Sequence, residues 1–366
     1  MNKIEAYGEV DLELLKNLSE ADGISGCEKE ASQVMKKYLD EYADKVTYDN
    51  LGSIIGLKKG SEDGPRIMIA GHLDEVGFMV RKIEDNGYVR LLPVGGWWGH
   101  VLPCHRLVIT TADGNKITGM VGARAPHGLS DEVKNTVVKP IDMFLDLGVE
   151  NKEEVEALGI QIGDMVTPDT KFEVMNNPNY LCGKAWDDRI GAAVAVDVLK
   201  ALQGEEHKSN VYAVGSVQEE VGIRGARTAT HNIKPDIAFA LDVTISKDTP
   251  VDKGEIGLGK GIVLSIVDAM TVSNTALVKK IDEIAKDLGL EVNYSCSTSG
   301  GTDAGNIHKS FDGILATTLY IPTRYMHSHR AIIHRKDYDQ TVKVITEFCK
   351  RFDRETLEII RGCNRG

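Results

Sequence analysis

After about residue 180 the sequence alternates between amphipathic helix segments and short apolar strand segments. The helical segments are DRIGAAVAVDVLKAL, NTALVKKIDEIAKDLG and DYDQTVKVITEFCKRF, and the strand segments are VYAVGSV, DIAFALDV and GILATTLYIP. Upstream, Ile67–Ala70 in PRIMIAGHLD is a continuous apolar run of the kind buried on both faces. Strands that alternate with helices predict an α/β fold, with a mostly parallel sheet sandwiched by helices.

Between about 76 and 175 the pattern changes to short β-rich runs divided by turn residues. EDNGYVRL and TADGNKIT are typical of hairpins, because Asn-Gly and Asp-Gly suit tight turns. One short helix is expected at NKEEVEALG, where Asn151 and Glu154 have capping-box spacing. At 366 residues the chain is long for a single core. We therefore expect a discontinuous α/β domain of residues 1–75 and 176–366, divided by a small β-rich, barrel-like insert of residues 76–175.

Charge and composition exclude several classes of partner. The formal net charge of −12 argues against nucleic acid or an anionic membrane as the main partner. No apolar run reaches the roughly 18 residues of a membrane span, and the acidic first residues do not resemble a secretion signal. The six cysteines have no CxxC spacing, which is typical of a reduced compartment. These features predict a cytoplasmic protein.

Side chains that can bind a metal or move a proton stand at the ends of several predicted strands, before one predicted helix and in one loop. They are His72 and Asp74, Asp187 and Asp188, Glu219 and Glu220, Asp242, and the pair His327 and His329. Taken singly, each has a plainer interpretation as a surface histidine, a helix cap or a solvated carboxylate. In a parallel sheet, however, the carboxyl ends of the strands meet at one edge, where ligands bind. Together the side chains predict a strongly anionic pocket that needs a counter-charge.

Divalent metal ions are the simplest counter-charge. Histidine and carboxylate without cysteine is the ligand set of zinc, cobalt or manganese in hydrolytic sites. Two histidines and three carboxylates exceed the ligands of one catalytic zinc, but they suit two ions about 3.5–4 Å apart that share a carboxylate. In SVQEEVG, Glu219 and Glu220 end an apolar strand, and neighbours on an extended chain point to opposite faces. We therefore expect the two glutamates to have different tasks.

Six motifs occur in an order that resembles the M42 family of metallo-aminopeptidases over essentially the whole chain. They are GHLDEVGFMV, GKAWDDRIG, SVQEEVGIRGA, ALDV, GGTDAG and RYMHSH. The family includes tetrahedral aminopeptidases, glutamyl aminopeptidases and members labelled endoglucanases. The resemblance implies that His72, Asp187 and Asp242 hold one ion. It implies that Asp187, Glu220 and His327 hold the other, so that Asp187 is the bridge.

The resemblance also implies roles around the two ions. Glu219 would be the general base, and Asp74 would orient His72. The Asp187–Asp188 peptide bond would be cis, and Thr302 and Asp303 would lie near the substrate. His329 is expected either near the substrate or at the surface.

The expected substrates are short peptides, and one ion would bind their free α-amino group. The insert would be a dimerisation domain, and dimers of this family often assemble into twelve-subunit tetrahedra. Leucyl, glutamyl and lysyl preferences all stay open.

Two other functions are compatible with parts of the sequence. A glycoside hydrolase needs a pair of free carboxylates and no metal, and Trp97 and Trp98 would suit a sugar platform. A core or interface position is the more usual one for such aromatic residues. A non-catalytic metal-binding scaffold would not need Glu219. Chelator sensitivity distinguishes the first alternative from an aminopeptidase, and substitution of Glu219 distinguishes the second.

Overall fold

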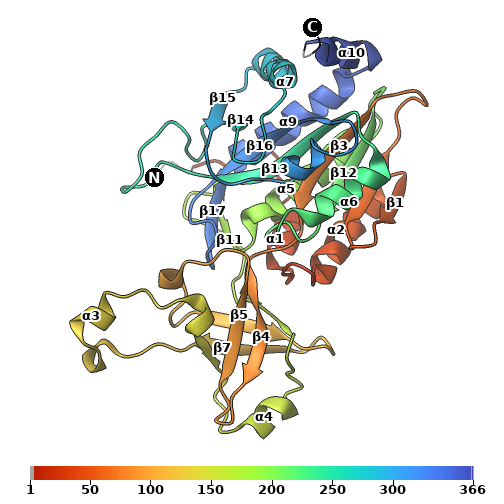
Figure 1. Ribbon diagram of the computed structural model, residues 1–366. Coiled ribbons are helices and arrows are strands. Elements are labelled where there is room, and N and C mark those ends of the chain that lie inside the picture. The colour runs from red at the N-terminus through yellow and green to blue at the C-terminus, as the bar shows by residue number, and fades with distance from the viewer. Residues whose placement is uncertain (1–3, 364, 366) are drawn as a thin grey trace.

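A mixed eight-stranded sheet lies at the centre of the computed structural model, which describes residues 4–363 and 365 (Figure 1). In spatial order its strands are β1 (Lys45–Tyr48), β2 (Ile54–Lys58), β12 (Asn210–Ser216), β3 (Arg66–His72), β13 (Ile237–Ile245), β16 (Leu315–Thr323), β14 (Ile262–Val267) and β15 (Val292–Cys296). The central strands β12, β3, β13 and β16 are parallel neighbours, as predicted. The pairs β2–β12 and β14–β16 are antiparallel, so the sheet is mixed towards its two edges.

Helices cover both faces of this sheet. One face carries α1 (Leu12–Glu20), α2 (Lys29–Tyr42), α5 (Trp186–Ala201), α7 (Thr275–Asp287), α9 (Arg335–Arg351) and α10 (Arg354–Gly362). The other carries α6 (Arg224–Ile233) and α8 (Ala304–Ile307). Burial on both faces of the sheet explains why the sequence of β3 is apolar from Ile67 to Ala70. Ile67 and Ile69 pack into the first cluster, whereas Met68 and Ala70 pack into the second. Each fully buried aliphatic side chain of this size contributes about 1.5–3 kcal/mol.

Six antiparallel strands form a closed barrel that extends away from the α/β part, with α4 at its far end (Figure 1). They are β4 (Gly77–Ile83), β5 (Val89–Val94), β8 (Phe144–Asp146), β7 (Lys116–Val121), β6 (Arg106–Thr110) and β9 (Met165–Pro168). The first and last strands are neighbours, since Phe78 of β4 pairs with Val166 of β9. Both side chains are buried in a separate apolar core inside the barrel.

Short elements complete the barrel region and its junction with the sheet. They are α3 (Asp131–Lys134), α4 (Lys152–Ala157), the 3-10 helices Gly99–Val101, Pro126–Gly128 and Pro140–Asp142, and a small sheet of β10 (Glu173–Val174), β11 (Tyr180–Gly183) and β17 (Ala331–His334). Helix α4 begins as predicted, because Oδ1 of Asn151 accepts a hydrogen bond from the Glu154 N–H at 2.9 Å. Trp97 stacks on Phe78, whereas Trp98 is 63% exposed. Among the described residues, no helix combines the length and apolar character needed to cross a membrane.

Candidate active site

Strand β3 and helix α5 approach each other closely at the edge where β3 ends. A Cβ atom at Gly71 would lie 2.3 Å from the backbone nitrogen of Ala192, so only glycine permits this contact. Asp188 fastens the two elements together, because its Oδ2 accepts from the His72 N–H at 3.1 Å and its Oδ1 from the Gly191 N–H at 3.0 Å. The Asp187–Asp188 peptide bond is cis, as the resemblance implied. The side chains of His72 and Asp187 therefore meet, although 115 positions separate them in the chain.

Asp187 lies between two imidazoles. Its Oδ1 is 3.1 Å from Nε2 of His72, and its Oδ2 is 3.1 Å from Nε2 of His327. Oε1 of Glu220 is 3.5 Å from the same nitrogen of His327. Atoms of His72, Asp187 and Glu220 lie within 4.8 Å of one another, a separation that allows a shared metal ion. Asp187 thus has the central position that a bridging carboxylate requires.

A cavity of about 360 Å³ opens beside these residues at the carboxyl edge of the sheet. Six of the predicted site residues line it together: Asp187, Glu219, Glu220, Asp242, Thr302 and His327. Asp242 belongs to β13, and the two glutamates follow β12. His72 does not line the cavity but reaches it through its contact with Asp187. Strand ends that are far apart in sequence therefore converge on one hollow.

The geometry of SVQEEVG differs from the expectation. Strand β12 ends at Ser216, and Gln218 has a φ of +57°, so the chain turns before the two glutamates. The carbonyl of Glu219 accepts hydrogen bonds from the N–H groups of Gly222 and Ile223, both at 2.9 Å. The expectation that strand geometry turns Glu219 and Glu220 to opposite faces was therefore wrong. Both side chains line the same cavity.

Asp74 was expected to orient His72, but its carboxylate mainly supports the turn that carries Glu219 and Glu220. Nδ1 of His72 lies 2.9 Å from the backbone carbonyl oxygen of Asp74, and 3.7 Å from its carboxylate. The carboxylate instead accepts from the N–H groups of Glu219 and Glu220, at 3.0 and 3.1 Å, and from the Ser25 hydroxyl at 2.6 Å. Asp74 thus holds the segment that carries both glutamates, while its backbone orients the histidine.

The carboxylates of this site strongly influence one another's pKa. Burial and then the neighbouring Asp187 and Asp188 raise the pKa of Asp242 well above its usual range. Burial and Asp187 raise the pKa of Glu220 to about 7. Although burial opposes the shift, hydrogen bonds to His327 and His72 lower the pKa of Asp187. Oε1 of Glu220 is also buried, with no hydrogen-bond partner among the residues that the structure describes. Divalent cations would relieve this crowding of negative charge and satisfy that oxygen, so the donor set fits them.

The barrel region contributes directly to the site. Nδ1 of His327 lies 2.8 Å from the carbonyl oxygen of Gly96, in the segment that follows β5. His329, two residues later, is 96% buried and does not line the cavity. Its ring stacks on His105 at a centroid distance of 3.8 Å and meets the edge of Trp97 at 5.6 Å. His329 therefore packs between the loop that carries His327 and the barrel, away from the surface.

Thr302 and Asp303 have different surroundings. Thr302 lines the cavity, and its hydroxyl lies 2.8 Å from that of Thr318. Asp303 is buried behind it, where its Oδ2 accepts from the Ser216 hydroxyl at 2.5 Å. Burial raises the pKa of Asp303 to about 6. Contact of either residue with substrate stays a prediction, for which the position of Thr302 is the better suited.

A buried ion cluster behind the site was not anticipated from the sequence. Lys184 is 2% exposed, and its Nζ contacts Oε1 of Glu75 and lies 2.9 Å from Oδ1 of Asp22. The other oxygen of Asp22 is 2.6 Å from Nζ of Lys116 on barrel strand β7. Arg189 donates to the carbonyl oxygens of Leu18 and Ala21 at 2.7 and 3.0 Å and to that of Leu73 at 2.5 Å. In the sequence, this cluster is indicated only by Lys184 and Arg189, which stand on either side of Asp187 in GKAWDDRIG.

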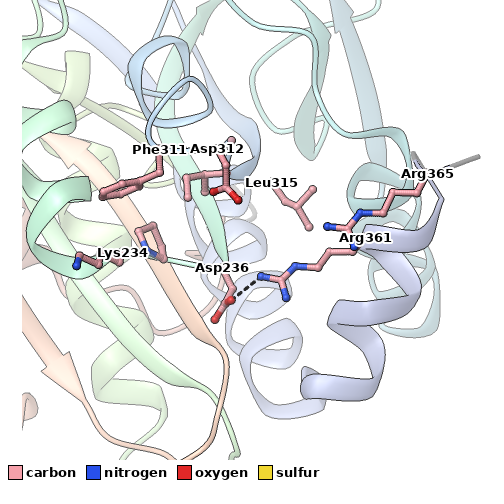
Figure 2. Close-up of a pocket in the computed structure, with 10 residues that line it drawn as sticks. Lys234, Asp236, Phe311, Asp312, Leu315, Arg361 and Arg365 are labelled. Atoms are coloured by element: carbon pink, nitrogen blue, oxygen red, sulfur yellow. Dashed lines mark hydrogen bonds and ion pairs between the residues drawn. The ribbon is translucent and has the colours of Figure 1, made fainter.

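A larger cavity, of about 780 Å³, lies where β13 and β16 begin, at the opposite edge of the sheet (Figure 2). Arg361 points into it and forms ion pairs with Asp236 and Glu358, both at 2.7 Å. The lining residues that the structure describes there include no histidine. Ligands of parallel α/β sheets bind beyond the carboxyl ends of the strands, so the smaller cavity is the candidate active site.

Comparison with known proteins agrees with the fold. The family model described as M42 glutamyl aminopeptidase matches residues 52–344. The lysyl aminopeptidase of Pyrococcus furiosus is 36% identical over 343 residues, which are 92% of this chain and 95% of the relative.

Two solved structures are similar over nearly the full length. A TET aminopeptidase from a marine-sediment Thaumarchaeota archaeon has a TM-score of 0.92 and 39% identity, with 95% of this chain and 98% of that chain covered. The TET1 peptidase of Pyrococcus horikoshii, which can assemble into a tetrahedron or a large octahedral shell, has a TM-score of 0.83 and 31% identity. The similarity covers 93% of this chain and 99% of the Pyrococcus horikoshii chain.

Proposed function

The chain belongs to the M42 glutamyl aminopeptidase family and is an aminopeptidase, and we propose that it hydrolyses peptides through two divalent metal ions and a glutamate base. One observation above all supports this proposal. The two oxygens of Asp187 each lie 3.1 Å from a different imidazole, at a cavity that Glu219 also lines. A carboxylate with a histidine on each side can bridge two ions, each of which also takes one of the histidines.

The proposed ligands divide into two sets around Asp187. His72, Asp187 and Asp242 would hold one ion, and Asp187, Glu220 and His327 would hold the other. The nitrogen and oxygen donors suit zinc or cobalt, and manganese as a third choice. Bound there, the ions would polarise the scissile carbonyl and lower the pKa of the attacking water.

We assign Glu219 the role of a proton carrier rather than of a ligand. Its Oε2 lies 4.0 Å from Nε2 of His72, and its backbone is fixed by Asp74. Glu219 would accept a proton from the water as the water oxygen bonds to the carbonyl carbon. It would then pass that proton to the leaving nitrogen as the carbon–nitrogen bond breaks. The products are the free first amino acid and the shortened peptide.

We propose a division of labour between two parts of the chain. Residues 1–75 and 176–366 would form the catalytic domain, and residues 76–175 would form a dimerisation domain. The closed barrel has its own core, which supports treating it as a separate unit. The assembly of the similar Pyrococcus horikoshii peptidase into a tetrahedron or an octahedral shell supports a homo-oligomer. We propose that dimers are its building block and that it reaches a dodecamer. Short peptides in the cytoplasm are the proposed substrates.

A substrate panel on metal-stripped protein tests the activity and its cofactor together. Leucyl, methionyl, glutamyl and lysyl p-nitroanilides are offered before and after zinc, cobalt or manganese is returned. We expect no hydrolysis by the stripped protein and recovery with at least one metal. Activity that survives chelation contradicts the metal mechanism. Chelator-resistant hydrolysis of a polysaccharide would indicate a glycoside hydrolase instead.

A further inference from the structure

The active-site cavity has a second wall that the proposed chemistry does not use. It comes from the end of β13, from β15 and the loop after it, and from Tyr320 and Met326. The residues that matter for recognition are Thr244, Ile245, Ser295, Ser297, Tyr320 and Met326. Under the proposed function, the scissile carbonyl and the α-amino group lie on the metal-binding side. The side chain of the first residue must then face the second wall.

This second wall is uncharged. Apart from Glu219 and the proposed ligands, none of the described residues that line the cavity is lysine, arginine, aspartate or glutamate. The wall offers hydroxyl groups from Thr244 and Ser295, and apolar surface from Met326 and Ile245, the latter 56% exposed. The wall can thus form hydrogen bonds and apolar contacts, but it has no charged group that could pair with a charged substrate side chain.

Two charged side chains near this wall, Arg324 and Asp268, do not line the cavity. Arg324 precedes Met326 by two residues, but its guanidinium pairs with both oxygens of Asp248, at 2.9 and 2.8 Å. Asp268 is buried, does not line the cavity and accepts from the N–H groups of Met270 and Thr271, both at 2.7 Å. Tyr320 adds a phenol, which carries no charge near neutral pH.

We propose that this wall is a neutral side-chain pocket that selects peptides whose first residue is uncharged, such as leucine or methionine, and rejects acidic and basic first residues. The proposal rests on the proposed function, which places the peptide. A carboxylate there would be desolvated beside Asp242 without a cation to pair with. An ammonium group would be desolvated against hydroxyl and methyl groups without a carboxylate. Either loss strongly weakens binding in the transition state.

The test compares kcat/KM for leucyl, methionyl, glutamyl and lysyl p-nitroanilides on the metal-loaded full-length protein and on charge-adding variants. The wild type is expected to prefer the uncharged substrates by about tenfold or more. Ser295→Lys adds a cation to the wall and is expected to raise the glutamyl-to-leucyl ratio about tenfold. Thr298→Lys adds the same charge to an exposed loop position outside the wall and is expected to change that ratio less than about twofold.

Other outcomes distinguish failure of the pocket proposal from failure of the proposed aminopeptidase function. A wild type most active on the glutamyl or lysyl substrate overturns the neutral pocket but leaves the aminopeptidase intact. A Ser295→Lys protein with an unchanged ratio also overturns the pocket. Ile245→Lys, on the same wall, replaces it if Ser295→Lys does not fold. A metal-loaded protein that hydrolyses none of the four substrates contradicts the proposed function, and the pocket with it.

Discussion

The carboxylate of Asp74 accepts a hydrogen bond from the backbone N–H of Glu219 at 3.0 Å, across 145 positions of sequence. Asp74 follows β3, and Glu219 follows β12, the neighbouring parallel strand. The bond therefore fixes the position of the proposed base relative to His72 and the proposed metal ligands. Since Asp74 is fully buried, no water competes for this bond.

Asp74→Asn tests this support. The amide keeps the shape of the side chain but replaces an acceptor oxygen with a donor, so it cannot accept all three hydrogen bonds. We expect kcat/KM to fall about 10- to 100-fold and the free energy of unfolding to fall by about 1–3 kcal/mol. Steady-state kinetics and urea denaturation measure the two effects. Asp85→Asn, on an exposed barrel turn, is the matched control and should change neither.

Glu219→Gln tests the base. Glutamine cannot carry the proton from water to the leaving nitrogen, so kcat should fall about 10²- to 10⁴-fold. Metal content, measured by plasma spectrometry, should stay at the wild-type level because Glu219 has no proposed ligand role. Glu132→Gln, at an exposed position in α3, provides a matched substitution away from the site. Full activity with metal bound would contradict the assignment of Glu219.

Metal binding should also stabilise the fold. An ion that binds only the native state adds about 2.7 kcal/mol at 100 times its Kd, so returning zinc or cobalt to stripped protein should raise Tm by about 5 °C. Asp187→Asn should lose most of this rise, because the central ligand is impaired. Asp312→Asn, at the opposite cavity, should retain it. An equal rise in both variants would argue against Asp187 as the bridge.

The buried cluster behind the site should matter for stability. Lys184→Met removes the buried cation that Glu75 and Asp22 share and leaves Glu75 only the guanidinium of Arg189, at 3.7 Å. Breaking a buried ion pair costs about 3–5 kcal/mol. Denaturation midpoints at constant m-value measure this loss. Lys171→Met is the control, because that lysine is 73% exposed and lies 3.5 Å from Glu20. Exposed pairs contribute about 1 kcal/mol or less. Equal effects of the two substitutions would contradict the special role of Lys184.

The Asp248–Arg324 pair predicts a pH dependence. Hydrogen bonding to Arg324 lowers the pKa of Asp248 below its unfolded value of about 4. A lowered carboxyl pKa stabilises the fold above the unfolded pKa, and this contribution is lost as pH falls towards the folded pKa. Asp248→Asn should therefore be less stable than the wild type at pH 7, and the difference should shrink towards pH 3. Denaturation at both pH values measures it, and a constant difference would contradict the role of the charge.

The sequence predicts the sheet because its strands are buried on both faces. It also predicts that the proposed metal ligands meet at the carboxyl edge of that sheet. Ile67 and Met68 must be apolar since both faces of β3 are covered, and the strand that carries them delivers His72 to the shared edge. Periodicity records such burial wherever an element is regular. The positions of Asp187 and Asp242 follow from the same rule.

The turn at Glu219 could not be predicted in this way. Its shape depends on the left-handed conformation of Gln218 and on hydrogen bonds from Asp74, which is distant in sequence. Local propensity contains no information about such a partner. Lys184 is a second example: a lysine before a helix is usually solvated, and only the fold shows that Glu75 and Asp22 enclose it.

The pairing of β4 with β9 has a consequence for how the chain folds. Because the barrel begins and ends on adjacent strands, its closure brings the two ends of the long insert together. Before closure, His72 and Asp187 are the ends of a 115-residue loop, whose entropy cost grows with its length. After closure, that loop behaves as a much shorter one. A barrel that forms early would therefore lower the entropic cost of bringing His72 and Asp187 together. On such a folding pathway, barrel closure precedes assembly of the proposed metal site.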